Sequence, residues 1–173
     1  MKFFQELSKT FKYVRLICYD EINAETLAIF FEYKLFSLKK DTNEAKQIIS
    51  LANSSGCSLA VRAEDIFVVT HWLTAYLGQQ LVSWQKQEFN QPPKPMVYLI
   101  QDYEAGFYPW GSEHLLVRST YEYKEPMIAV FNSNLLKQYF HKQNYHFDHE
   151  YSFEPKMNEA LSNLRSNLKE RKT

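Results

Sequence analysis

Hydrophobic residues in this chain form short continuous runs that alternate with longer stretches of helical spacing. The runs at 13–19, 66–70, 96–100 and 127–131 have the length of strands, and none shows the polar alternation of a half-exposed sheet. Apolar residues three and four positions apart predict helices at 23–31, 71–88, 112–123 and 133–140. This order predicts an α/β fold, a Rossmann-like parallel sheet flanked by helices on both faces, in one domain spanning residues 1–173.

Several weaker patterns complete this prediction. A short strand is expected at Leu35–Leu38, and Ser112 and Ser133 are candidate caps of their helices. Amphipathic helices are expected at 3–11 and from Pro155 onward. Thr42 is the candidate cap of another helix, which would bury Ala45, Ile48, Ile49 and Ala52 and end at Gly56. On the helix at 71–88, the expected buried face carries Leu73, Leu77, Leu81 and Trp84.

Composition narrows the class of protein. With 45% hydrophobic and 23% charged residues, the chain can bury a core and is not disordered. The 20 basic residues equal the 20 acidic ones, so no net charge attracts nucleic acid. Cys18 and Cys57 are interpreted as buried thiols, since a secreted disulfide framework would need more cysteines. Without a signal-peptide pattern or an apolar run of membrane-span length, a cytoplasmic location is expected.

Polar side chains stand where each predicted strand ends. In an open parallel sheet the carboxyl ends of the strands share one edge, and ligands bind beyond it. A rim of candidate binding residues is therefore expected there. The alternative interpretation of each residue is a helix cap, and for His71 a structural role is favoured over a catalytic one. The rim comprises Asp20, Glu21, Thr70, His71, Gln101, Asp102, Asn132 and Ser133.

The segment 101–112 combines four aromatic rings, two acids and two glycines. Rings are costly in an exposed loop unless they are buried or meet a ligand. Carboxylates beside aromatic faces suit sugars, because the acids accept hydroxyl hydrogen bonds while the rings cover C–H faces. The alternative is that Phe107 and Trp110 anchor the loop in the core.

Several enzyme motifs are missing from the sequence. It contains no dinucleotide-binding glycine motif, Walker loop, metalloprotease helix or nucleophile elbow. His146, Asp148 and Glu150 alternate on an extended segment and could share one side. Without a fourth ligand nearby, a solvated charged loop is favoured there, and no metal or cofactor is expected.

Two segments carry a resemblance to a known family, Asp65–Tyr76 and Tyr98–Ser112, and shorter matches follow at Thr120–Tyr121, Phe131–Ser133 and Phe153–Pro155. On these residues the chain resembles bacterial rhamnosyltransferases that elongate surface polysaccharides, members of the GT-B glycosyltransferase superfamily. The resemblance implies two facing Rossmann-like domains, of which this chain would supply the N-terminal, acceptor-binding one. The C-terminal donor domain is expected to lie outside this sequence. Gln101 departs from the pattern, standing where many retaining relatives carry His, and the donor-binding residues stay unassigned.

The function implied by this resemblance is sugar transfer from a nucleotide-sugar donor to a glycan acceptor in surface polysaccharide, O-antigen or lipopolysaccharide biosynthesis. The favoured donor is dTDP-rhamnose, and this chain alone is expected to be inactive. Asp102 and Glu104 are the candidate catalytic residues, because either could bind acceptor hydroxyls and help to remove a proton. The candidate acceptor-binding residues are Thr70, His71, Trp72, Gln101, Tyr103, Tyr108, Trp110 and Ser112.

The expected partners follow from this function. They are a glycan or lipid-linked oligosaccharide, a nucleotide-sugar donor held by a second domain, and the inner face of the membrane through peripheral association. The alternative function is a non-catalytic Rossmann-like module whose aromatic loop contacts a protein. A flavodoxin-like nucleotide binder is disfavoured, because glycine is scarce at the strand-to-helix turns.

Overall fold

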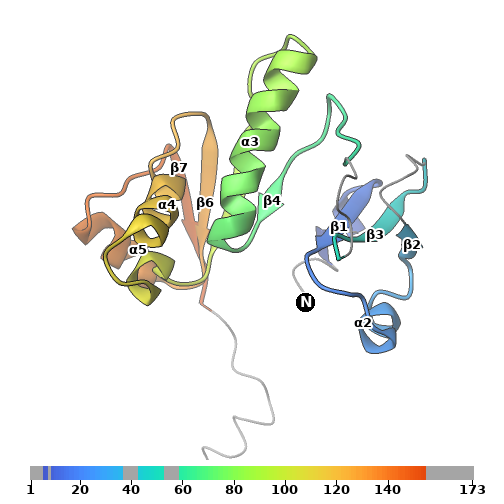
Figure 1. The fold of residues 1–173 in the computed structure, drawn as a ribbon, viewed down its shortest axis with the longest axis horizontal. Coiled ribbons are helices and arrows are strands. Elements are labelled where there is room, and N and C mark those ends of the chain that lie inside the picture. Colours follow the sequence, from blue (N-terminus) through green and yellow to red (C-terminus); the bar gives the residue numbers. More distant parts are fainter. Residues whose placement is uncertain (1–5, 8, 37–42, 53–58, 155–173) are drawn as a thin grey trace, which may run out of the picture. The chain divides into compact units, whose positions relative to one another are not determined.

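The computed structural model describes residues 6–7, 9–36, 43–52 and 59–154, and the chain divides between residues 61 and 62 into two compact units (Figure 1). The first unit contains a three-stranded sheet in the order β1-β3-β2. The second contains a four-stranded sheet in the order β4-β5-β6-β7. All strand pairs are parallel, which confirms the predicted Rossmann-like α/β class.

The first unit contains the elements β1 (Val14–Cys18), α2 (Ala24–Ile29), β2 (Lys34–Phe36) and β3 (Lys46–Ser50). β1, α2 and β2 confirm the predictions at 13–19, 23–31 and 35–38. Phe30, Tyr33 and Ile48 form the buried core of this unit. Cys18 lies beside that core and is half-buried, and burial together with the charge of Asp20 raises the pKa of its thiol. Cys57 lies outside the described residues.

The helix predicted after Thr42 is wrong, because residues 46–50 form β3, the central strand of the first sheet. Ile48 pairs with Leu16 on one side and with Leu35 on the other. A strand between two neighbours is buried on both faces, so consecutive apolar residues there can mimic helical spacing. Gly56 and the helix from Pro155 lie outside the described residues. Of the helix predicted at 3–11, residues 6, 7, 9 and 10 are helical.

The second unit confirms most of the predicted order of strands and helices. It contains β4 (Val68–Val69), α3 (Trp72–Glu88), β5 (Met96–Ile100), the 3₁₀ turn η1 (Glu104–Phe107), α4 (Ser112–Tyr121), β6 (Met127–Phe131), α5 (Asn134–Lys142) and β7 (His149–Ser152). β7 falls where a solvated charged loop was predicted. It pairs with β6 from His149 onward, and polar residues are common on such edge strands because they deter pairing with other chains.

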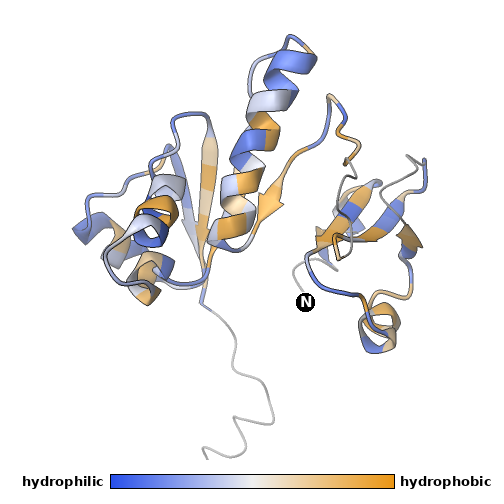
Figure 2. Cartoon of the chain, in the orientation of Figure 1, coloured by the Kyte–Doolittle hydropathy of each residue, from blue (hydrophilic) through white to orange (hydrophobic). Residues whose placement is uncertain are grey.

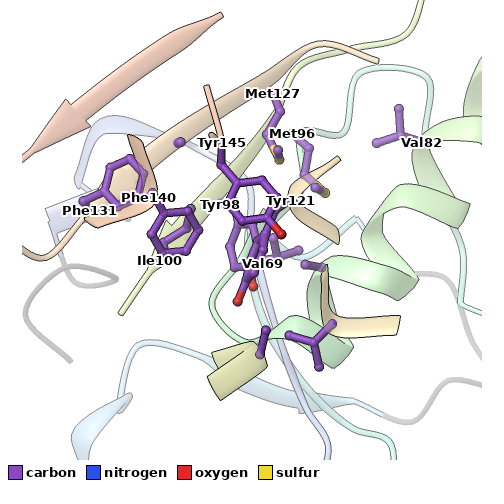
Figure 3. Packing of buried hydrophobic residues seen from close by; sticks show 14 residues of the cluster. Val69, Val82, Met96, Tyr98, Ile100, Tyr121, Met127, Phe131, Phe140 and Tyr145 are labelled. Atoms are coloured by element: carbon purple, nitrogen blue, oxygen red, sulfur yellow. The ribbon is translucent and has the colours of Figure 1, made fainter. Parts of the chain in front are cut away.

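The helices α3, α4 and α5 contribute to one hydrophobic cluster on a single face of the second sheet. The sequence predicted helices on both faces, but in the part of this unit that the structure describes, helices pack on one face only. Neighbouring strands follow one another in chain order, and right-handed crossovers in one direction bring successive helices to the same face. The strands supply Val69, Met96, Tyr98, Ile100, Met127, Ala129 and Phe131, and the helices supply Ala75, Val82, Val117, Tyr121 and Phe140 (Figure 3). Val97, Ile128 and Val130, whose side chains point to the opposite face of the sheet, are half-buried.

The buried face of α3 differs from the predicted one. Trp84 is exposed and Leu73, Leu77 and Leu81 are only half-buried, whereas Ala75, Gly78, Val82 and Gln85 are buried. The small residues among these allow the helix to approach the sheet closely. The last turn of α3 is hydrophilic (Figure 2). Among the helices that the structure describes, none has both the length and the apolar character needed to cross a membrane.

The start of α4 also differs from the prediction. Its N-cap is Gly111 rather than Ser112, and no side chain caps the helix. Leu115 is exposed, whereas Val117, Thr120 and Tyr121 are buried. The cap expected at Ser133 is confirmed, since its hydroxyl accepts a hydrogen bond from the backbone N–H of Leu136.

The close approach of α3 to the sheet predicts that Gly78→Ala is destabilising. A Cβ atom at this position would lie 2.9 Å from Met96 Sδ and 2.9 Å from Val69 Cγ1, which is closer than normal packing permits. We expect the free energy of unfolding to fall by about 1–3 kcal/mol, the usual effect of overpacking a core. Urea unfolding measures the change. Gln80→Ala on the exposed side of the same helix is the control, and equal effects of the two substitutions would contradict the prediction.

Candidate functional site

The predicted rim of the second unit comes together at the carboxyl ends of β4, β5 and β6. The side chain of Gln101 donates to the carbonyl of Thr70 at 3.1 Å, and Asn132 donates to the carbonyl of Gln101 at 2.8 Å. Each strand end is thus hydrogen-bonded to the next. Asp20 and Glu21 follow β1, which belongs to the separate sheet of the first unit, so the prediction that they share one sheet edge with the other rim residues is wrong.

Glu104 is the buried carboxylate of this region. Its side chain is only 10% exposed, and its Oε2 accepts hydrogen bonds from the backbone N–H of Trp72 at 2.6 Å and from the hydroxyl of Tyr98 at 3.4 Å. Burial raises the pKa of Glu104, although the Trp72 hydrogen bond and the nearby His71 oppose this shift. The carboxylate therefore occupies the N-terminus of α3, where the helix dipole favours negative charge.

His71 is the N-cap of α3. Its Nδ1 accepts a hydrogen bond from the backbone N–H of Leu73 at 3.2 Å, and Thr74 completes the capping box. Because Nδ1 is an acceptor, the neutral ring carries its proton on Nε2, which lies 3.9 Å from Glu104 Oε1. The capping hydrogen bond to Nδ1 agrees with the structural role favoured for His71.

Two tyrosines anchor the aromatic loop to the body of the second unit. The ring of Tyr103 packs against Tyr121, Tyr139 and Phe140, with centroid distances of 5.2–5.9 Å. The hydroxyl of Tyr108 accepts a hydrogen bond from Trp72 Nε1 at 3.0 Å. These contacts give both tyrosines a packing role and fix the ends of η1.

Phe107 and Trp110 are exposed, by 64% and 73% respectively. The alternative that these two rings anchor the loop in the core is therefore wrong. Trp110 is held in place from α4, because His114 lies 4.8 Å from its ring and the Arg118 guanidinium lies 5.9 Å from it. An exposed indole with a fixed position is suited to stacking on a ligand.

Asp102 is an exposed carboxylate two residues after the end of β5. Its Oδ1 accepts a hydrogen bond from the backbone N–H of Tyr103 at 2.8 Å, which orients the carboxylate. Ser112, also exposed, begins α4. The two candidate catalytic acids therefore differ in environment, with Asp102 facing solvent and Glu104 enclosed.

Sequence reasoning missed three residues of this region. Tyr98 contacts Glu104 from within β5, and no local pattern reveals that contact. His114 and Arg118 follow Trp110 at intervals of four residues, the spacing of one helix face. That spacing could have identified them as supports of the indole ring.

A shallow depression on the surface of the second unit lies elsewhere. It follows α3 and is lined by Tyr76, Gln79, Gln80, Ser83, Trp84, Gln87 and Tyr123. None of the residues predicted for the site lines it. The candidate site consists instead of the polar rim and the exposed rings of the aromatic loop.

The fold and the rim define a Rossmann-like α/β protein with polar residues gathered where this class binds its ligands. Residues 1–134 match the family described as WsaF, N-terminal domain. The chain belongs to this family, whose domain is associated with glycosyltransferases. No curated protein matches the chain.

Proposed function

We propose that this chain is the acceptor-binding domain of a rhamnosyltransferase in surface-glycan biosynthesis. WsaF is an S-layer glycan rhamnosyltransferase, which favours rhamnose as the transferred sugar and dTDP-rhamnose as the donor. One observation carries the acceptor role: Asp102 and the fixed, exposed Trp110 belong to one short loop at the carboxyl edge of the sheet. A carboxylate and an aromatic face together match the hydroxyl groups and C–H faces of a sugar.

In the proposed reaction, an acceptor hydroxyl forms a new C–O bond at the anomeric carbon of the donor while the bond to the nucleotide diphosphate breaks. Asp102 binds the attacking hydroxyl and orients it, and Trp110 covers the sugar beside it. The hydroxyl proton passes to Asp102 if the reaction inverts configuration, or to the departing phosphate if it retains it. Glu104 acts as a positioning residue, because it fixes the start of α3.

The donor diphosphate is assigned to a second domain rather than to this rim. A phosphate commonly binds at a helix N-terminus, but in α3 the Glu104 carboxylate already accepts the hydrogen bond from Trp72 N–H. A further anion there would meet like charge. The proposed partners of this domain are a glycan or lipid-linked oligosaccharide and the cytoplasmic face of the membrane, and the balanced charges of the chain favour no nucleic-acid partner.

A second candidate function is a non-catalytic module that binds a protein through the same loop. The exposure of both Phe107 and Trp110 favours it, since large aromatic residues dominate protein interfaces. The two functions differ in whether a free saccharide binds the loop.

Calorimetric titration with rhamnose-containing oligosaccharides separates the two candidates. We expect Asp102→Asn and Trp110→Ala each to weaken saccharide binding about tenfold, the equivalent of one lost charged hydrogen bond or one lost stacking contact. The control is Trp84→Ala, an exposed tryptophan on α3, which should leave the affinity unchanged. Equal affinities in all four proteins would contradict the acceptor role and favour a protein partner.

A further inference from the structure

The turn between α5 and β7 brings two imidazoles and a carboxylate together. His141 lies in the last turn of α5, His146 follows in the connection, and Glu150 lies in β7. One nitrogen of each histidine and one oxygen of Glu150 all lie within 4.8 Å of one another. The sequence alone showed His146 and Glu150 as neighbours but did not place His141 beside them.

The distances within this cluster are close to those of a metal site. His141 Nε2 lies 2.7 Å from Glu150 Oε2, and the two imidazole centroids are 4.9 Å apart. Zinc–ligand bonds of about 2.0–2.2 Å place two ligand atoms of a tetrahedral site about 3.3–3.6 Å apart. To reach that spacing, the side chains of the half-buried His141 and the exposed His146 have to rotate.

The surrounding backbone orients the carboxylate for such a role. The backbone N–H of Phe147 donates to Glu150 Oε1 at 2.9 Å, which leaves Oε2 directed toward His141. A carboxylate with one oxygen hydrogen-bonded and the other directed at the ion is the usual arrangement around protein-bound metals. Asn144, with a φ of 64°, makes the turn that returns the chain from α5 toward β7.

Lys137 is the competing partner in this cluster. Its ammonium lies 3.2 Å from Glu150 Oε2 and neutralises the carboxylate that a metal would use. Lys137 lies one helical turn before His141, so it contacts Glu150 from the same face of α5. A divalent ion has to displace this ammonium, and removal of Lys137 should therefore favour metal binding.

We infer that His141, His146 and Glu150 form a binding site for a borderline divalent metal ion such as Zn²⁺, with a fourth position open to water. Two imidazoles and one carboxylate are ligands that zinc accepts in proteins. The site fastens the edge strand β7 to α5. It lies toward the amino end of β7, because α5 begins after the carboxyl end of β6 and runs back to the start of the next strand. The proposed saccharide rim is at the other edge, so the two proposals are independent.

The test uses the 173-residue chain without an affinity tag. Zn²⁺ is titrated against a chromophoric chelator, and Co²⁺ serves as a spectroscopic probe. We expect one Zn²⁺ per chain and a visible Co²⁺ absorption of four-coordinate intensity. His146→Asn, which changes an exposed side chain, and His141→Asn should each lower the Zn²⁺ affinity by at least about tenfold. Lys137→Met should raise it, an effect that a purely structural ion-pair cluster would not produce.

His149→Asn is the matched control, because this neighbouring imidazole is exposed and its position in β7 faces away from Glu150. It should bind Zn²⁺ as the unaltered chain does. Circular dichroism checks that every variant is folded. The inference is overturned if no stoichiometric Zn²⁺ binding occurs, if His149→Asn loses as much affinity as His146→Asn, or if Lys137→Met weakens binding.

Discussion

Phe140→Ala is expected to lower the free energy of unfolding of the second unit by about 3–5 kcal/mol, the usual cost of removing a fully buried aromatic ring. Phe140 has no exposed surface. Its ring centroid lies 4.9 Å from that of Tyr121 and 5.2 Å from that of Phe131 (Figure 3). Truncation leaves a cavity surrounded by rigid rings, which cannot collapse to fill it. Guanidinium unfolding followed by circular dichroism measures the loss.

The matched control for this prediction is Leu135→Ala in the same helix. Leu135 is 77% exposed, so its truncation should change the stability by less than about 0.5 kcal/mol. The Phe140 variant should also weaken saccharide binding, because Tyr103 packs on Phe140 and anchors the aromatic loop. Similar losses of stability in the two variants would show that the aromatic cluster is not the core of this unit.

The fold was predictable wherever local pattern and burial agree. The run 127–131 is apolar and β-branched, and it forms the inner strand β6. The prediction failed at residues 46–50, where Ile48 and Ile49 fit both a helix and a strand buried on both faces. Only the pairing with β1 and β2 distinguishes these two structures, and such pairing is a long-range property.

The buried face of α3 shows a second reason why a prediction from the sequence was wrong. The large residues Leu73, Leu77 and Leu81 suggested one stripe, yet the helix packs through Gly78 and its neighbours. Close approach to a sheet favours small side chains, and hydrophobicity alone does not reveal it. The edge strand β7 was missed for a related reason, since its polar residues carry no apolar pattern.

The candidate site was predictable as a location but not as a set of contacts. Topology places Thr70, Gln101 and Asn132 at one edge of the sheet, and the structure joins them by hydrogen bonds. The topology alone does not reveal that Asp102 is exposed while Glu104 is buried. That difference depends on Trp72, which lies 32 residues earlier in the chain.

Glu104→Ala is expected to destabilise the second unit by about 3 kcal/mol. Two enclosed donors, the backbone N–H of Trp72 and the hydroxyl of Tyr98, would lose their acceptor, at roughly 1–3 kcal/mol for each. The start of α3 would also lose its negative partner. Glu104→Gln is the matched control, because its amide oxygen can still accept both hydrogen bonds, and it should retain most of the stability. Urea unfolding at one pH compares the two variants. Equal losses of stability would contradict the role of Glu104 as the hydrogen-bond acceptor of these two donors.

The raised pKa of Glu104 also predicts the direction in which the stability of the second unit changes with pH. Burial raises the pKa of Glu104 above its ordinary value of 4.5, despite the opposing effects of Trp72 and His71. The folded state therefore binds a proton at the Glu104 carboxyl group more tightly than the unfolded state does. The resulting stabilisation is complete below the unfolded pKa and is lost as the pH rises through the folded pKa.

Glu104→Gln is the control, because glutamine has no ionisable group at this position and its stability should not show this decrease. The stability of the unaltered chain relative to Glu104→Gln should thus decrease from pH 4 upward, and parallel curves would mean that burial does not dominate the ionisation of Glu104.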